Sequence, residues 1–201
     1  MPTLTTNTPE VAYLMERDWR LRHLIEAVGN LSYEVSGSAF EHVAHSVIEQ
    51  MLSMKVGRTI EGRLRELCGG EITGEAVLSL SLQELARTMP EQRLQGLAVL
   101  SDDEVRAALT TVRGIGRWTA DMFLIFYLER PDILPVEDGA VRQVFRWLYG
   151  APLTDDNVRE VVCSLWQPYS STAVRYMYRA LNSGFVVGES ASPLWETESR
   201  R

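Results

Sequence analysis

The amino-acid sequence predicts an all-α protein, and three kinds of observation support this class. Many segments carry apolar residues three or four positions apart, as one face of an amphipathic helix requires. Helix-start signals recur, including two capping boxes, Ser81–Glu84 and Ser101–Glu104. No segment alternates apolar and polar residues over more than a few positions, as an exposed strand would. The 201 residues, 45% of them hydrophobic, suffice for one domain or for two small domains that share a core.

The first helices are predicted from local start and stop signals. Residues 8–10, Thr-Pro-Glu, combine a capping hydroxyl, a proline at the first helical position and an early acid. The helical pattern continues with breaks to about Val28 and ends at Gly29. Residues 36–38, Ser-Gly-Ser, open the next helix, whose apolar stripe extends to Met51. Another predicted helix covers about 53–67 and ends at two glycines.

The C-terminal part follows the same rules. Thr154 begins a helix that reaches Trp166, and the last predicted helix runs from about Ser171 to Ser183. The polar segment 189–201 is predicted to be a loose tail.

The segment between these parts, Ala107 to Gly150, contains the most informative motif. A helix ending near Thr111 is followed by a six-residue turn, Val-Arg-Gly-Ile-Gly-Arg, and a second helix begins near Trp118. The two glycines of the turn allow a tight hairpin that another molecule can approach closely. The amides at the start of the second helix suit a phosphate. Further on, the proline-rich turn 131–138 ends in a carboxylate, Asp138, at the start of a third helix.

These residues resemble the helix–hairpin–helix DNA glycosylase superfamily, whose signature is a V-x-G-I/V-G hairpin, a Gly/Pro-rich loop and an aspartate. The matching residues are Val112, Gly114, Ile115, Gly116, Pro131, Pro135 and Asp138. The stretch GIGRWTA, residues 114–120, resembles the 3-methyladenine DNA glycosylase II (AlkA-type) branch. The resemblance covers roughly residues 38–184.

The resemblance implies a two-lobed helical (HhH-GPD) fold with the active site in the cleft between the lobes. Family members with a fuller architecture also have a β-rich N-terminal domain, for which we expect no room in this chain. Helices in 1–37 would pack with those in 151–188 to form one lobe. Residues 38–150 would form the central lobe, with the helix–hairpin–helix at about 107–128 and the Gly/Pro-Asp loop at 131–138.

Asp138 is the predicted catalytic residue. Cleavage of an N-glycosidic bond builds positive charge on the sugar, which a fixed carboxylate stabilises while it orients the attacking water. The alternative is that Asp138 only caps the helix starting at Gly139, and the two roles are compatible. The adjacent Glu137 is predicted to be solvated.

Trp118 determines which kind of glycosylase the resemblance implies. Bifunctional members carry a lysine at this position, whose amine forms a Schiff base. With tryptophan there, we expect a monofunctional enzyme without AP-lyase activity. Trp118, Met122 and Tyr169 would line the base pocket, where an aromatic face suits a cationic purine. A core position in an amphipathic helix is the alternative for Trp118.

DNA contacts are implied at two further places. Gln50, Met51 and Ser53 resemble the family's Q-x-x-S segment, in which Met51 would enter the base stack as a wedge; Met51 could equally complete the preceding apolar stripe. At the hairpin, the DNA-binding residues would be Arg113, Gly114, Gly116 and Arg117. The resemblance also implies that a sodium or potassium ion binds there to three backbone carbonyls, those of Thr110, Val112 and Ile115.

Composition limits partners and cofactors. A net charge of −7 argues against broad phosphate neutralisation, so we expect weak, salt-dependent binding to damaged duplex DNA. Two distant cysteines suit a reduced cytoplasmic protein and exclude a four-cysteine iron–sulfur cluster. No apolar run is long enough for a membrane span, and we expect no signal peptide. His42, His45 and Glu49 share a helical face, where solvation is favoured over a metal site.

The predicted function is that of a monomeric bacterial, nucleoid-associated glycosylase. It would release 3-methyladenine, 7-methylguanine and similar alkylated purines after base flipping and leave an abasic site, with no cofactor needed for the chemistry. The alternatives are a non-catalytic helix–hairpin–helix DNA-binding module and a bifunctional glycosylase/lyase.

Overall fold

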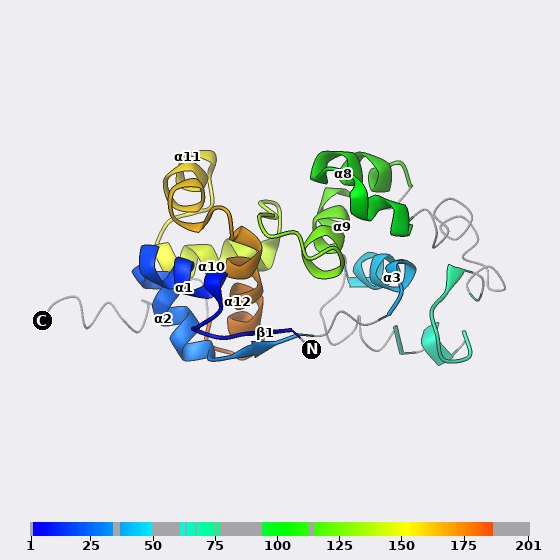
Figure 1. Ribbon diagram of the computed structural model, residues 1–201, viewed down its shortest axis with the longest axis horizontal. Coiled ribbons are helices and arrows are strands. Elements are labelled where there is room, and N and C mark those ends of the chain that lie inside the picture. Colours follow the sequence, from blue (N-terminus) through cyan, green and yellow to red (C-terminus); the bar gives the residue numbers. More distant parts are fainter. Residues whose placement is uncertain are drawn as a thin grey trace, which may run out of the picture. The chain divides into compact units, whose positions relative to one another are not determined.

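The computed structural model of the 201-residue chain describes residues 2–33, 37–49, 61–62, 64–66, 68–74, 76, 94–112 and 115–186 (Figure 1). These residues are mostly helical, which confirms the predicted class. One short antiparallel pair was not predicted: β1 (Thr3–Leu4) pairs with β2 (Leu31–Ser32), with Thr3 opposite Ser32. Strands of two residues are too short to produce an alternating pattern. In the described part of the chain, no helix has the length and apolarity that crossing a membrane requires.

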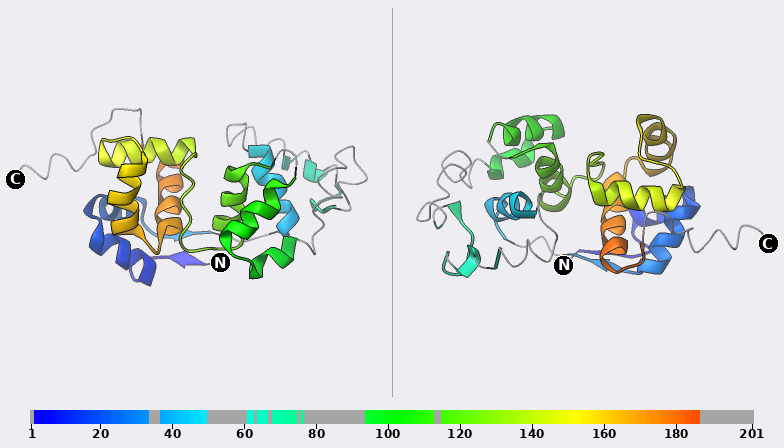
Figure 2. Two further views of the ribbon diagram at one scale, coloured as in Figure 1. Left: turned by 90° about the horizontal axis from the view of Figure 1, so that it is seen from above. Right: turned by 180° about the vertical axis from the view of Figure 1, so that it is seen from behind.

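The chain divides into two compact units. The first unit comprises residues 1–34 and 130–201, and the second unit comprises residues 35–129 (Figures 1 and 2). Residues 130–150 were expected in the central lobe, but they belong to the first unit. The reason is that the helix they contain, α10 (Gly139–Tyr149), packs against α12 (Ser170–Asn182) and α2 (Trp19–Val28).

The first unit is built around α12. Its other helices are α1 (Pro9–Arg17), α2, α10, α11 (Asp155–Asn157) and the π-helical η3 (Val158–Trp166). Residues 170–177 of α12 are all buried, so this helix is covered on every side. Figure 2 shows α12 (orange) between the blue N-terminal helices and the yellow-green α10. The predicted cap, Asp138, precedes α10, and Gly150 ends the helix with a left-handed φ of 65°.

A buried carboxylate joins four helices of the first unit. Asp18 ends α1 and begins α2, and its Oδ1 accepts the N–H groups of Arg20 (3.0 Å) and Leu21 (3.1 Å). Its Oδ2 accepts Nε1–H of Trp166 (2.9 Å), from η3, and the hydroxyl of Tyr149, from α10. Burial raises the pKa of the Tyr149 hydroxyl well above its usual range, and the charge of Asp18 adds to this effect. The hydroxyl therefore stays protonated and donates to the carboxylate.

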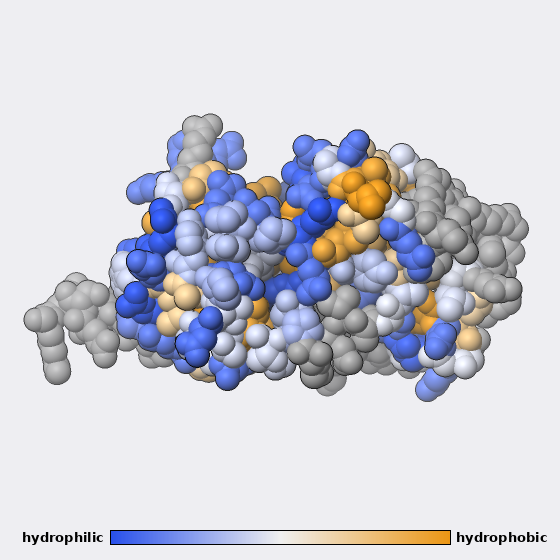
Figure 3. Space-filling model, viewed as in Figure 1, coloured by the Kyte–Doolittle hydropathy of each residue, from blue (hydrophilic) through white to orange (hydrophobic). Residues whose placement is uncertain are grey.

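The described second unit contains α3 (Ala39–Glu49), the 3₁₀-helical η1 (Gly96–Val99), α8 (Asp102–Thr110), α9 (Arg117–Met122) and the π-helical η2 (Phe123–Tyr127). α3 packs against α9 and η2, and α8 packs against α9. Most of the predicted helix over 53–67 lies outside the described residues, and the capping box at Ser81 lies entirely outside them. Figure 3 shows apolar side chains at the surface over α8 and α9.

Candidate active site

The carboxylate of Asp138 is fixed by both of its oxygens. Its backbone N–H donates to the carbonyl of Pro135 (3.0 Å), which closes the proline-rich turn. Oδ1 accepts the N–H of Val141 (2.7 Å) and so caps α10. Oδ2 accepts the hydroxyl of Tyr178 (2.7 Å), from α12. Asp138 is 5% exposed, so the cap predicted for it is present and its carboxylate has a single defined orientation.

Tyr178 was not predicted as a site residue. It lies 40 positions after Asp138, on a helix that meets α10 only in the folded unit. No local signal in the sequence marks it, since a tyrosine in an amphipathic helix is usually explained by packing alone.

The turn that leads to Asp138 is also held at its other end. The N–H of Ser171 donates to the carbonyl of Pro131 (3.0 Å), and the N–H of Ile133 donates to the Ser171 hydroxyl (2.9 Å). Asp132 Oδ1 accepts the hydroxyl (2.5 Å) and N–H (3.3 Å) of Ser170. Ser170 therefore anchors the turn. The start of α12 thus positions the segment that carries Asp138.

The predicted pocket residues belong to different units. Tyr169, in the first unit, is half-buried, and its ring meets that of Tyr13 edge to face with centroids 5.1 Å apart. Trp118 and Met122 lie on α9 in the second unit, where Trp118 is half-buried and Met122 is 6% exposed. A pocket formed by these three residues stays a prediction. Tyr13, which the sequence analysis did not select, supports the Tyr169 ring.

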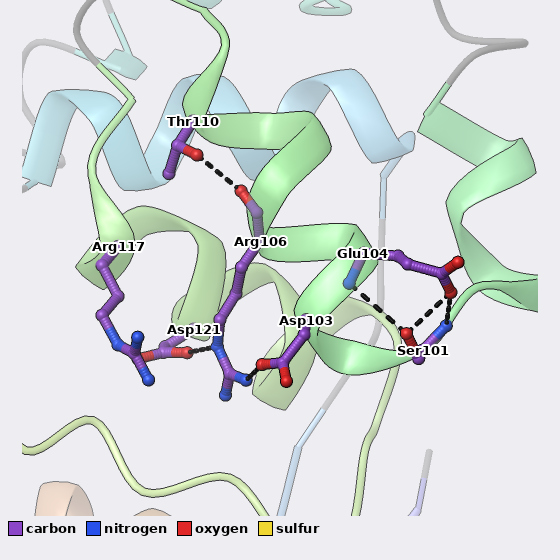
Figure 4. Close-up of polar contacts among 7 residues, drawn as sticks. All are labelled: Ser101, Asp103, Glu104, Arg106, Thr110, Arg117 and Asp121. Atoms are coloured by element: carbon purple, nitrogen blue, oxygen red, sulfur yellow. Dashed lines mark hydrogen bonds and ion pairs between the residues drawn. The ribbon is translucent and has the colours of Figure 1, made fainter.

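The hairpin of the second unit is closed by backbone hydrogen bonds. The N–H of Val112 donates to Leu109 O (3.1 Å), and the N–H of Ile115 donates to Val112 O (3.0 Å). Both side chains are buried, which anchors the turn in the core. Ser101 and Glu104 form the predicted capping box at the start of α8 (Figure 4). Arg113 and Gly114 lie outside the described residues, as do Gln50, Met51 and Ser53 of the predicted wedge segment.

Gly116 was expected, with Gly114, to allow a tight hairpin that another molecule can approach closely. Its φ of −94° and ψ of 178° are extended values that any residue adopts. A Cβ at this position would meet no atom within 4 Å. The fold of the second unit therefore does not require glycine here, and a steric requirement would have to come from a bound molecule.

A buried aspartate holds the two hairpin helices together. Asp121 of α9 accepts from Arg106 Nε of α8 at 2.7 Å, and Arg106 Nη1 also pairs with Asp103 at 2.9 Å. Burial alone lowers the pKa of Arg106, but the hydrogen bond and charge of Asp121, followed by those of Asp103, outweigh it and raise the pKa. Figure 4 shows Arg106 and Arg117 on either side of Asp121.

Arg117, a predicted DNA contact, is only loosely tied to this cluster. Its Nε lies 3.9 Å from Asp121 Oδ2, and its side chain is 57% exposed. Such a pair is weak, so the guanidinium remains available to solvent and to anions. The sequence analysis did not predict Arg106 and Asp121 as partners.

Two members of the alternative metal set, His42 and His45, have other partners in the structure, and the side chain of Glu49 lies outside the described part. His45 Nδ1 lies 2.5 Å from Glu61 Oε2, and the His42 ring packs against Tyr127. Burial opposes ionisation of Glu61, but its hydrogen bonds and charge interactions with His45 and Arg65 outweigh burial and lower its pKa. Among the described residues, no group of three metal-binding side chains occurs. At the hairpin, the Val112 carbonyl accepts one hydrogen bond and retains a second lone pair, which is compatible with the expected monovalent cation.

No family model matches the sequence. The structure is similar to the crystal structure of a DNA-3-methyladenine glycosidase from Bacillus halodurans, with a TM-score of 0.78 and 27% identity over 98% of this chain and 100% of that chain. It also shares the fold of the Schizosaccharomyces pombe 3-methyladenine DNA glycosylase in complex with abasic DNA (TM-score 0.76, 24% identity, 92% of this chain, 100% of that one). By sequence, the chain is 25% identical to DNA-3-methyladenine glycosylase 1 of S. pombe, over 88% of each protein.

In fold and in sequence the chain is similar to DNA-3-methyladenine glycosylases, in agreement with the resemblance noted at the hairpin and Asp138. Its relatives by sequence and by structure include several proteins of this name.

Proposed function

We propose that this protein is a DNA glycosylase of base excision repair that hydrolyses the N-glycosidic bond of alkylated purines such as 3-methyladenine and 7-methylguanine. The observation that carries this proposal is the fixed carboxylate of Asp138, which two hydrogen bonds of 2.7 Å orient at the start of α10. The names of its relatives supply the substrate class.

The proposed chemistry needs no other protein acid. As the bond to the base breaks, positive charge develops on the sugar, and an already oriented carboxylate stabilises it without reorganising. An N-alkylated purine carries positive charge before cleavage and leaves readily as a neutral base. Asp138 would also orient the attacking water. The reaction then leaves an abasic site in an intact strand.

We assign the enzyme to the AlkA type without AP-lyase activity. The support is Trp118, which follows the hairpin at the position where bifunctional members carry a lysine. A tryptophan offers no amine for a Schiff base. We also propose that a monovalent cation binds the hairpin carbonyls and that the protein acts on damaged duplex DNA as a cytoplasmic monomer.

Base release from methylated duplex DNA tests the proposed function. The expected result is release of methylated purines, with strands that remain intact until alkali is added. Borohydride should trap no covalent adduct between protein and DNA. A trapped adduct would instead favour the bifunctional enzyme. Binding of the duplex with no base release would favour the non-catalytic module.

The substitution Gly116→Ala tests whether the glycine of the hairpin is needed for the stability of the fold or for DNA binding. Because the added methyl group meets open space and the backbone is extended, the only cost to the fold is the poorer capping of α9 by alanine, and the free energy of unfolding should fall by no more than about 1 kcal/mol. If DNA phosphates approach the amide here, the methyl group should weaken duplex binding roughly tenfold. Chemical denaturation and fluorescence anisotropy measure the two effects. Equal affinities for wild type and variant would show that the DNA backbone does not approach this glycine.

A further inference from the structure

A groove of about 580 Å³ runs along α10 in the first unit, outside the contacts described for Asp138. Its lining residues are Gly139, Arg142, Gln143, Arg146, Pro152 and Leu153. The two arginines are four positions apart, so they lie on the same face of α10, about 6 Å apart along its axis. Pro152 and Leu153, from the loop after α10, give the groove an apolar wall.

Both arginines present positive charge that the described protein does not neutralise. Arg142 and Arg146 are exposed, and among the described residues neither forms an ion pair with a carboxylate. Arg142 Nε donates to the carbonyl of Val136 (2.7 Å), which leaves its Nη groups as donors. The protein has a net charge of −7, so two guanidinium groups in one groove make that part of the surface positive although the protein as a whole is negative.

The position of the groove relates it to the proposed chemistry. It begins at Gly139, the residue that follows Asp138, so one helix carries the carboxylate at its start and both arginines on its outer face. The bond between Arg142 and Val136 also ties the groove to the turn that ends in Asp138. A sugar bound at Asp138 would bring the neighbouring phosphates of its strand to the start of α10, and Arg142 and Arg146 lie about 6 and 12 Å further along the helix axis.

We propose that this groove binds the phosphodiester backbone of the DNA strand from which the base is released. Guanidinium groups bind phosphate oxygens through paired N–H donors, and they suit this ligand better than ammonium groups do. The inference rests on the proposed function for the identity of the strand. It gives this acidic protein a localised anion site in the first unit, separate from the hairpin of the second unit.

Arg146→Gln is the primary test, because none of the hydrogen bonds described for the Asp138 turn involves the Arg146 side chain. We expect its affinity for a duplex that carries an abasic-site analogue to fall about fivefold near 0.1 M salt. The slope of log K against log salt should become shallower by about 0.9, the value for one lost phosphate contact. Arg142→Gln should have a similar effect, and the double variant should lose about two units of slope.

Two exposed arginines of the same unit provide matched controls. Arg22 Nε donates to the carbonyl of Met15 (2.7 Å), as Arg142 Nε does to Val136, and Arg179 lies in the last turn of α12 as Arg146 does in α10. Arg22→Gln and Arg179→Gln remove the same charge from positions outside the groove. They should keep wild-type affinity and slope. An equal loss in the controls and in the groove variants would mean a general charge effect and would overturn the proposal.

Methylphosphonate substitution identifies the phosphate that is bound. Neutralising single phosphates near the abasic analogue should weaken wild-type binding at one or two positions. A methylphosphonate at the phosphate that contacts Arg146 should not weaken DNA binding by the Arg146→Gln variant any further, because that contact is already lost. Unchanged affinity and slope in Arg146→Gln would overturn the proposal. The proposal would also be overturned if the groove bound inorganic phosphate through Arg146 but Arg146→Gln bound DNA with wild-type affinity, because the site would then hold an anion other than DNA.

The binding assays do not require catalysis, so the two proposals can fail separately. If the wild type releases no methylated base but the groove variants lose affinity as described, the glycosylase proposal fails and the phosphate groove stands. If base release occurs and the groove variants bind normally, the groove proposal fails alone. A wild type that does not bind duplex DNA would overturn both.

Discussion

Asp138→Asn is expected to lower the single-turnover rate of base release by about a thousandfold while the protein remains as stable as the wild type. Asparagine is as good an N-cap as aspartate, so its oxygen still accepts the N–H of Val141. Its amide also remains within hydrogen-bond distance of the Tyr178 hydroxyl. The substitution therefore removes the negative charge and keeps the cap, which separates the two roles of this residue.

Release of 7-methylguanine under single-turnover conditions measures the first effect, and chemical denaturation measures the second. Glu137→Gln is the matched control, because Glu137 is the adjacent carboxylate, is exposed and was predicted to be solvated. It should retain release within a few-fold of the wild type. If Asp138→Asn keeps wild-type activity, Asp138 is only a helix cap and the catalytic assignment is wrong.

Asp18→Ala is expected to lower the free energy of unfolding by about 3–5 kcal/mol, the largest stability loss predicted for this chain. The alanine removes the cap of α2 and leaves the donors of Trp166 and Tyr149 without their common acceptor. Trp166 is fully buried, so water cannot easily replace the lost carboxylate. Burial raises the pKa of Tyr149, so loss of a proton from its hydroxyl offers no relief.

Urea unfolding measures how much the buried hydrogen bonds of Asp18 add to the stability that a helix cap alone provides. The proteins to compare are the wild type, Asp18→Ala and Thr154→Ala. Thr154 caps α11 at an exposed position, where its loss should cost about 1 kcal/mol. Asp18→Asn keeps one capping oxygen and should fall between the two alanine variants. If Asp18→Ala costs no more than Thr154→Ala, the bonds from Tyr149 and Trp166 contribute nothing to stability.

The sequence by itself determined the features whose signals lie within a few residues of one another. Ser101 and Glu104 mark the start of α8, and Asp138 that of α10. Thr8 is at the N-cap position of α1 as predicted, but its hydroxyl accepts the N–H of Thr5 and does not bond to α1. Hydrogen bonds of helix ends span only three or four residues, so the local sequence is sufficient to predict them. The hairpin residues and Asp138 likewise lie close enough in sequence to show a resemblance to DNA glycosylases, which the comparisons support.

Only the tertiary structure decided which distant side chains meet. The hydroxyl of Tyr178 reaches Asp138 across 40 positions, and Trp166 reaches Asp18 across 148. The first contact follows from the packing of α12 against α10, and the second from the packing of η3 against α1. Such packing depends on apolar faces that many different helix pairings would bury equally well. The assignment of residues 130–150 to the first unit has the same cause. Local hydrogen bonding therefore explains the elements of this protein, whereas helix packing sets the orientation of its candidate catalytic carboxylate.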